Sequence, residues 1–96
     1  KDTKISGQVF NPSPNPFNPS TDISYELIDP TDVRVLIYDM RGKKIHELIN
    51  KKQEIGKHSV RWFGTDNRNR PVSTGVYFCK IKIGELLITK KLIFLK

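Results

Sequence analysis

Hydrophobic and polar residues alternate with a period of two along most of the chain. The clearest runs place apolar side chains at every second position of 21–28, 33–39, 57–63 and 74–83. Successive side chains of a β-strand point to opposite sides, so such alternation is typical of strands that bury one face. β-branched and aromatic residues dominate the runs, as they do in known strands. The pattern therefore predicts an all-β protein.

Turn-forming sequences divide this pattern into seven predicted strands. These strands are expected at 8–12, 21–28, 33–39, 43–49, 57–63, 74–83 and 86–95. Only 45–54 (IHELINKKQE) could alternatively form a helix. Seven short strands favour a two-layered arrangement, so the predicted fold is a seven-stranded antiparallel immunoglobulin-like β-sandwich. We expect residues 1–6 to be the end of a linker and residues 7–96 to form the domain.

Three turns have specific sequence signatures. Residues 39–42 (DMRG) place Asp first and Gly fourth, which is the preference of a type I turn. In the polar stretch 66–71 (DNRNRP), Asn69 is expected to adopt the left-handed conformation that Asn tolerates. The pair Gly84-Glu85 is expected to close a tight hairpin between the last two strands.

Four X-Pro pairs lie in the segment 11–19, directly before the strand at 21–28. Proline fixes its own φ and favours extended geometry in the preceding residue. We therefore expect a stiff segment that carries the chain from one sheet to the other. Phe17, between two of these pairs, is expected to close one end of the core.

The inward positions of the predicted strands define a core. Its expected members are Phe17, Tyr25, Val35, Ile37, Val60, Trp62, Tyr77, Cys79 and Ile81. Cys79 is the only cysteine, so an internal disulfide is impossible. Its apolar surroundings predict a buried thiol.

The chain is basic, with a net charge of +7. Such a charge attracts polyanions without specificity. The residues that could form a basic face are Lys43, Lys44, Lys51, Lys52, Lys57, Arg61, Arg68 and Arg70. No aromatic residues are interleaved with them and no docking helix is visible, so no specific nucleic-acid partner is expected. No apolar stretch approaches the 18 residues of a membrane span, so no transmembrane segment is expected.

Catalysis has little support in the sequence. A thiol nucleophile would require Cys79 beside His46 or His58, but Cys79 is expected in the middle of a strand. Residues 73–75 (STG) lack the flanking residues of a nucleophile elbow. The two histidines show no zinc-ligand spacing. We expect neither an enzyme nor a bound cofactor.

A weak calcium site is left open by the sequence. Asp29, Asp32 and Asp66 are expected in loops, and Ca²⁺ prefers carboxylate oxygens. No loop carries a dense series of such ligands, so an ordinary role in turns is the alternative.

Six segments of the chain, in order, resemble one known family. The segments are NPFNPST (15–21), ISYEL (23–27), VRVLIYDMRGKKI (33–45), GKHSVRW (56–62), RPVSTGVYFCKI (70–81) and KKLIFLK (90–96). Together they resemble the C-terminal sorting domain of cargo proteins of the type IX secretion system. That family is similar to the immunoglobulin-like domain of flagellar hook-capping proteins.

This resemblance implies a function. The domain is expected to follow a larger catalytic or adhesive domain and to be recognised by the outer-membrane secretion machinery. Export through the periplasm to the cell surface or medium is implied, followed by removal or exchange for a lipopolysaccharide anchor. Phe63 and Asn69 depart from an acidic residue and a glycine that are frequent in the family, and Cys79 replaces a larger apolar residue.

The last segment is the expected recognition site. It comprises Lys90, Lys91, Leu92, Phe94, Leu95 and Lys96. An export receptor could bind it by adding a strand to its edge. The alternatives are a structural immunoglobulin-like spacer beside an extracellular enzyme, and a hook-cap-like assembly domain.

Overall fold

The computed structural model describes residues 6–96 and contains seven strands. They are β1 (Gly7–Val9), β2 (Thr21–Leu27), β3 (Thr31–Asp39), β4 (Lys44–Gln53), β5 (Gly56–Trp62), β6 (Gly75–Ile83) and β7 (Leu86–Phe94). All seven predicted strands are present, although β1 is shorter and β4 longer than expected. The expected linker end at 1–6 lies outside the described residues, apart from Ser6.

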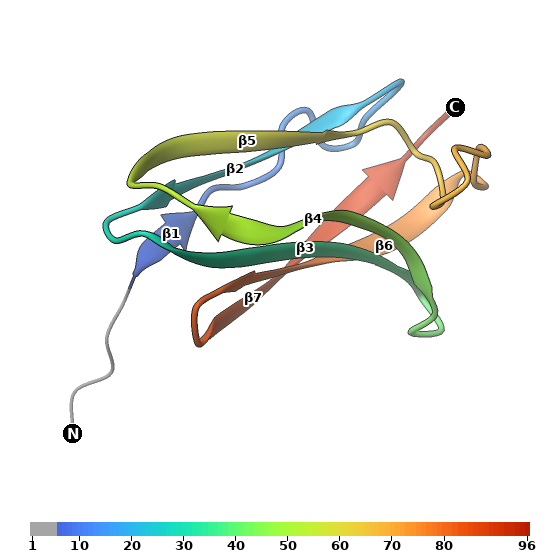
Figure 1. Ribbon diagram of the computed structural model, residues 1–96. Coiled ribbons are helices and arrows are strands. Elements are labelled where there is room, and N and C mark those ends of the chain that lie inside the picture. Colours follow the sequence, from blue (N-terminus) through green and yellow to red (C-terminus); the bar gives the residue numbers. More distant parts are fainter. Residues whose placement is uncertain (1–5) are drawn as a thin grey trace.

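The strands form two antiparallel sheets that pack face to face (Figure 1). One sheet has the order β1-β2-β5 and the other has the order β4-β3-β6-β7. This arrangement confirms the predicted immunoglobulin-like β-sandwich. The fourth strand pairs with β3 rather than with β5, whereas in the constant-type immunoglobulin arrangement it joins the first sheet.

The segment 45–54, which could have been a helix, forms most of β4 and the residue after it. Ile45, Leu48 and Ile49 are spaced like one face of a helix, yet all three pack against the core from a strand. Two register shifts between β3 and β4 explain this spacing. A β-bulge adds a residue to one strand and so changes which positions face inward.

The core lies between the two sheets. Eight of the nine expected core residues are buried, and Val60 is partly buried and packs against them. Phe17, Trp62, Tyr77 and Phe94 form an aromatic cluster at one end, with the Phe17 and Phe94 ring centroids 4.8 Å apart. Phe17 therefore closes the core as expected.

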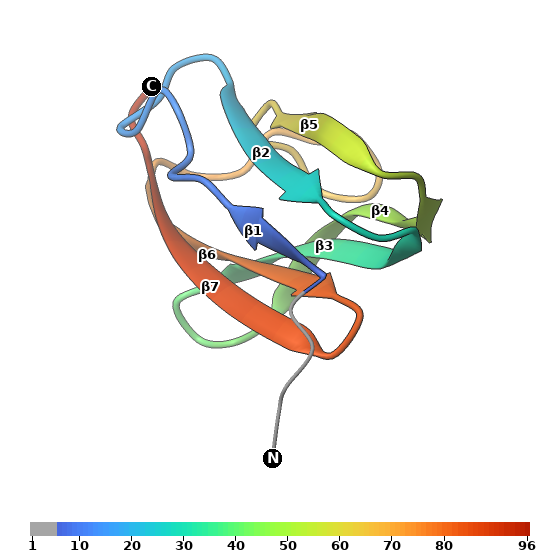
Figure 2. The same ribbon diagram turned by 90° about the vertical axis from the view of Figure 1, so that its left-hand side faces the viewer.

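The proline-rich segment does not cross between the sheets as expected. It joins β1 to β2, which are neighbours in the same sheet. The segment instead arches over to the end of β7, so that the C-terminus lies beside it (Figure 2). The peptide bonds before Pro14, Pro16 and Pro19 are cis.

Candidate functional site

The proline-rich segment closes the C-terminal part of the outer edge of β7. The Asn15 side chain donates from Nδ2 to the Lys91 carbonyl and accepts from the Ile93 N–H at Oδ1, both at 2.8 Å. The Phe17 N–H donates to the Ile93 carbonyl at 2.9 Å, and the Leu95 N–H donates to the Phe17 carbonyl at 3.1 Å. The backbone of 91–95 therefore has partners on this edge already.

An asparagine suits this position because its side chain carries one carbonyl and one NH₂ group, like a peptide unit. Pro14 and Pro16 flank Asn15, and proline has no N–H to offer a neighbouring strand. The Asn15 side chain thus supplies the hydrogen bonds that the backbone of this segment lacks. Capping of this kind protects an edge strand from pairing with another chain.

The side chains of the last segment divide into two groups. Leu92 and Phe94 are buried, with 0% and 4% of their surface exposed. A partner cannot reach them in the folded domain. Lys91, Leu95 and Lys96 are exposed, whereas Lys90 is half-buried. The structure thus removes two of the six expected recognition residues from the accessible surface.

Lys90 and Lys96, the first and last residues of this segment, also contact the rest of the domain. Nζ of Lys90 donates to Oδ1 of Asn11 at 3.1 Å. The backbone N–H of Lys96 donates to Oγ1 of Thr74 at 3.2 Å, and its Nζ lies 5.7 Å from the centroid of the Phe94 ring. Lys90 and Lys96 are therefore packed against other parts of the sandwich.

The loop after β5 fits closely against β7. A Cβ atom placed on Gly64 would lie 2.6 Å from the Phe94 ring, and φ of Gly64 is 68°. Any other residue here would meet both the ring and an unfavourable backbone conformation.

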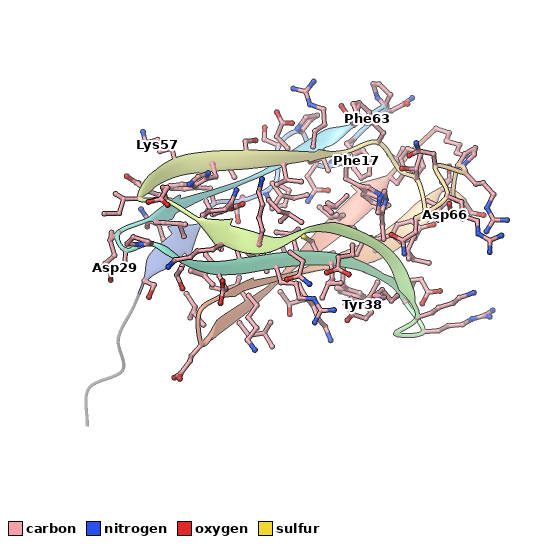
Figure 3. All side chains as sticks on the ribbon, viewed as in Figure 1. Phe17, Asp29, Tyr38, Lys57, Phe63 and Asp66 are labelled. Atoms are coloured by element: carbon pink, nitrogen blue, oxygen red, sulfur yellow. The ribbon has the colours of Figure 1, made fainter. Side chains whose placement is uncertain are left out.

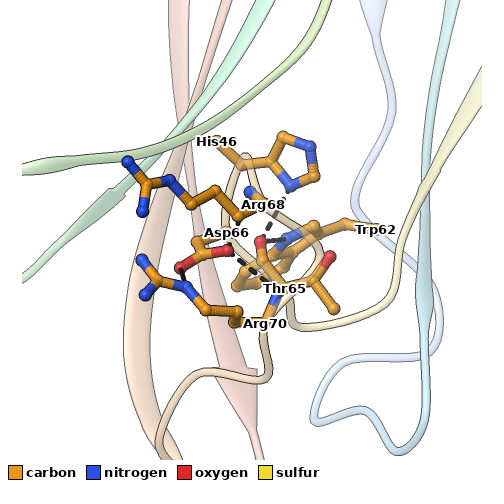
Figure 4. Close-up of polar contacts among 6 residues, drawn as sticks. All are labelled: His46, Trp62, Thr65, Asp66, Arg68 and Arg70. Atoms are coloured by element: carbon orange, nitrogen blue, oxygen red, sulfur yellow. Dashed lines mark hydrogen bonds and ion pairs between the residues drawn. The ribbon is translucent and has the colours of Figure 1, made fainter.

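The same loop is anchored by the Thr65 carbonyl (Figure 4). Nε1 of Trp62 donates to this oxygen at 2.8 Å, and Nδ1 of His46 lies at the same distance. A carbonyl oxygen can only accept, so Nδ1 of His46 carries a proton. This arrangement fixes the loop to both β4 and β5.

Asp66 organises the tip of the loop. Its Oδ1 accepts from the backbone N–H groups of Arg68 and Arg70 at 2.9 Å, and its Oδ2 accepts from Nε of Arg70 at 3.0 Å. The backbone hydrogen bond from Arg70 is the main cause that lowers the pKa of Asp66 below its usual value. Asn69 has a φ of 62°, which confirms its predicted left-handed conformation.

The turn after β3 repeats this design. Oδ1 of Asp39 accepts from the backbone N–H groups of Arg41 and Lys43 at 2.9 Å, and Gly42 has a φ of 86°. Both turns thus expose an arginine at the third position and another basic residue at the fifth. Between them lies a shallow depression of about 200 Å³, lined by Lys43, Lys44, Ile45, Asp66, Asn67, Arg68 and Arg70.

The basic residues singled out in the sequence do not form one face. Lys43, Lys44, Arg68 and Arg70 gather at this depression. The others lie elsewhere: Lys51 and Lys52 near the opposite end of β4, and Lys57 and Arg61 on β5.

Asn67 closes the outer edge of β4 in the way that Asn15 closes β7. The Asn67 N–H donates to the Ile45 carbonyl at 3.2 Å, and its Oδ1 accepts from the Glu47 N–H at 3.0 Å. Asparagines in loops therefore cap part of each edge of the four-stranded sheet. The sequence analysis did not predict that these asparagines cap strand edges. The only signal for this role was that both lie in loops that contain proline.

The residues considered for catalysis have structural partners. Burial raises the pKa of the Cys79 thiol to about 12, so it stays protonated and is a poor nucleophile. His46 and His58 bond the carbonyls of Thr65 and Glu54. The Ser73 carbonyl accepts from the Tyr77 hydroxyl at 2.6 Å.

The three carboxylates considered for calcium are not brought together. Asp29 follows β2 and Asp66 follows β5, and these antiparallel strands end at opposite ends of the sandwich (Figure 3). Asp32 lies on β3, near the Asp29 end. Within residues 6–96, no cluster of three or more His, Cys, Asp or Glu side chains could hold a metal ion.

Residues 13–95 match the model of the secretion system C-terminal sorting domain. The chain belongs to this family, and the match confirms the resemblance to type IX cargo. It is a sorting signal for type IX secretion, which directs export to the cell surface or extracellular space. None of the curated proteins searched matches this chain. Among the residues described, no helix is long and apolar enough to cross a membrane.

Proposed function

We propose that the folded domain is a noncatalytic module joined to a larger exported protein and read by the outer-membrane export machinery after passage through the periplasm. The recognition residues are the accessible side chains of the last segment, Lys90, Lys91, Leu95 and Lys96. The family match over residues 13–95 carries this proposal, because it extends through all of β7.

The partial closure of the β7 edge supports recognition through side chains at 91–95. Strand addition needs free backbone N–H and C=O groups, and Asn15 and Phe17 occupy those at 91–95. At 91–95 the machinery would therefore contact exposed side chains of the folded domain. Removal of the domain, or its exchange for a surface anchor, would follow export.

An export assay tests this proposal. A periplasm-targeted fluorescent reporter is fused to residues 1–96 in a bacterium that has a type IX system. The test variant is Lys91→Glu/Lys96→Glu, and the control variant is Lys51→Glu/Lys57→Glu. All four lysines are exposed and the two variants change the net charge equally. We expect several-fold less surface and medium fluorescence for the test variant alone.

Truncation is a weaker test, because removing residues 90–96 also removes Leu92 and Phe94 from the core. Circular dichroism of each purified variant establishes that the fold is intact. Export of the test variant at the level of the control would contradict recognition through these side chains. Periplasmic retention of the unmodified fusion, in a host that exports its own cargo, would favour the spacer.

A further inference from the structure

The outer face of the four-stranded sheet has an unusual composition. Residues paired in neighbouring strands point to the same side of a sheet, so the register identifies its members. We call this surface the basic face. It consists of Asp32, Arg34, Leu36, Tyr38, Lys44, Glu47, Asn50, Lys52, Val76, Phe78, Lys80, Lys82, Leu87, Thr89, Lys91 and Ile93.

Charge on the basic face is strongly unbalanced. The face carries six cationic side chains and two carboxylates, so it has an excess of four positive charges. One carboxylate, Glu47, already pairs with Nε of Arg34 at 3.2 Å. The cationic residues are Arg34, Lys44, Lys52, Lys80, Lys82 and Lys91.

Apolar residues occupy the middle of the basic face. Leu36 is only 8% exposed, although it lies on the outer side of β3. Tyr38 and Phe78 are neighbours in register and half-buried, and Lys44 and Lys91 lie at the two ends of the same row. Strands are about 4.8 Å apart, so this row spans about 14 Å. Figure 3 shows Tyr38 on the side of the sandwich opposite to Lys57.

We propose that the basic face is a docking surface for another protein. The partner's surface would be acidic around a flat apolar centre. A half-buried apolar centre with a charged rim is the usual anatomy of a protein–protein interface. The excess of positive charge selects a partner with carboxylates and steers its approach. The inference rests on the proposed function, because it takes the partner to be a component of the export machinery that contacts Lys91.

Nucleic acid and an anionic lipid surface fit the basic face less well than an acidic protein does. Stacking of nucleic-acid bases needs accessible aromatic planes, and Nζ of Lys80 lies 4.6 Å from the centroid of the Tyr38 ring. Insertion into a lipid surface needs apolar side chains that project from the protein. Leu36, in the centre, is almost fully covered instead, and the one strongly exposed apolar side chain of the face, Leu87, lies on its edge strand.

Binding is tested first with a defined probe. The ¹⁵N-labelled domain is titrated with an acidic peptide of Glu-Asp-Leu repeats, and separately with oligothymidylate and phosphatidylglycerol vesicles. We expect the peptide to shift amides of β3, β4, β6 and β7. Lys44→Glu/Lys82→Glu should weaken peptide binding about fivefold, and Lys51→Glu/Lys57→Glu should have a much smaller effect. Tighter binding of the nucleic acid or the vesicles to this face would overturn the choice of partner.

The export assay then separates the two proposals. Lys44 and Lys82 are exposed and lie outside the last segment, so Lys44→Glu/Lys82→Glu tests the basic face alone. Reduced export of this variant supports docking through the basic face. Normal export of it, together with reduced export of Lys91→Glu/Lys96→Glu, overturns the basic face and leaves the proposed function standing. Normal export of both variants overturns the basic face and also recognition through the side chains of the last segment.

Discussion

The two outer faces of the sandwich differ in charge and in apolar content. The face of the three-stranded sheet, which we call the balanced face, consists of Gln8, Asp22, Ser24, Glu26, Lys57, Ser59 and Arg61. Its two cationic side chains and two carboxylates give it no net charge. The basic face carries an excess of positive charge around Leu36, Tyr38 and Phe78.

On the balanced face, the register places complementary polar side chains opposite one another. Asp22 lies opposite Arg61, and Nε of Arg61 donates to Oδ1 of Asp22 at 2.7 Å. Ser24 lies opposite Ser59, with their hydroxyls 3.4 Å apart. Polar groups on this face satisfy one another across the strands. On the basic face, six cationic side chains share two carboxylates, so the two faces differ in how far their charges are paired.

The largest effect should come from the core that both faces share. We expect Phe94→Ala to lower the free energy of unfolding by about 3–5 kcal/mol, because it leaves a cavity beside Phe17 and Trp62. Phe78→Ala, on the basic face, should cost less than half as much because Phe78 is half-buried. Urea denaturation of both variants measures the difference. Equal losses would mean that Phe78 is a core residue and that the basic face has no accessible apolar centre.

A smaller effect should follow at the edge of the sheet that carries the basic face. Asn15→Ala leaves the Lys91 carbonyl and the Ile93 N–H to water, and should cost about 1 kcal/mol. The freed edge should also promote self-association, which analytical ultracentrifugation detects. Asn18→Ala is the matched control in the same loop, because Asn18 is an exposed asparagine that also precedes a proline. A monomeric Asn15→Ala domain of unchanged stability would contradict the capping role.

On the basic face itself, Lys80→Gln should cost about 0.5–1 kcal/mol. The substitution removes the ammonium group that lies over the Tyr38 ring. Lys82→Gln, one position along the same face, removes the same charge without that contact and should be nearly neutral. Thermal and urea unfolding compare the two. Equal stability of the two variants would show that the Tyr38 contact contributes nothing measurable.

The balanced face should show the smallest effect, and it should depend on pH. The hydrogen bond from Arg61 lowers the pKa of Asp22 below its usual value. The salt bridge therefore stabilises the fold above the unfolded-state pKa of about 3.9, and this contribution is lost as the pH falls through the folded-state pKa. Since water reaches both side chains, of which 57% (Arg61) and 37% (Asp22) is exposed, Asp22→Asn should cost about 0.2–1 kcal/mol at neutral pH.

The check is urea unfolding of the wild type and Asp22→Asn at pH 7 and at pH 2. The difference between them should shrink at the lower pH, where Asp22 approaches protonation in both states. Glu26→Gln on the same face provides a control for the loss of a carboxylate. A difference that grows on acidification would contradict the assigned role of the salt bridge.

Much of the fold was readable from alternation alone. The inward positions of β2, β3 and β6 follow a strict period of two, and the turn at Asn69 follows from local backbone preference. The uncertain case was β4, where bulges break the period and imitate helical spacing. Bulges depend on the partner strand, so a single segment does not reveal them.

The candidate site was only partly readable. Its location in the last segment came from the family motifs, but the sequence could not separate buried Leu92 and Phe94 from exposed Leu95. That distinction depends on which side of β7 faces Phe17 and Trp62. The basic face was missed because its members come from four strands. Tyr38 and Phe78 are distant in sequence and meet only through the register.

The sequence by itself determined the strands, most of the core and the family of this domain, because these depend on local periodicity and on motifs in a fixed order. Only the tertiary structure decided that Asn15 and Asn67 close parts of the two edges of one sheet, and that cationic side chains of four strands collect on one face. The physical reason is that strand pairing joins residues far apart in the chain. Charge and hydrogen bonding on a sheet surface are properties of those pairs.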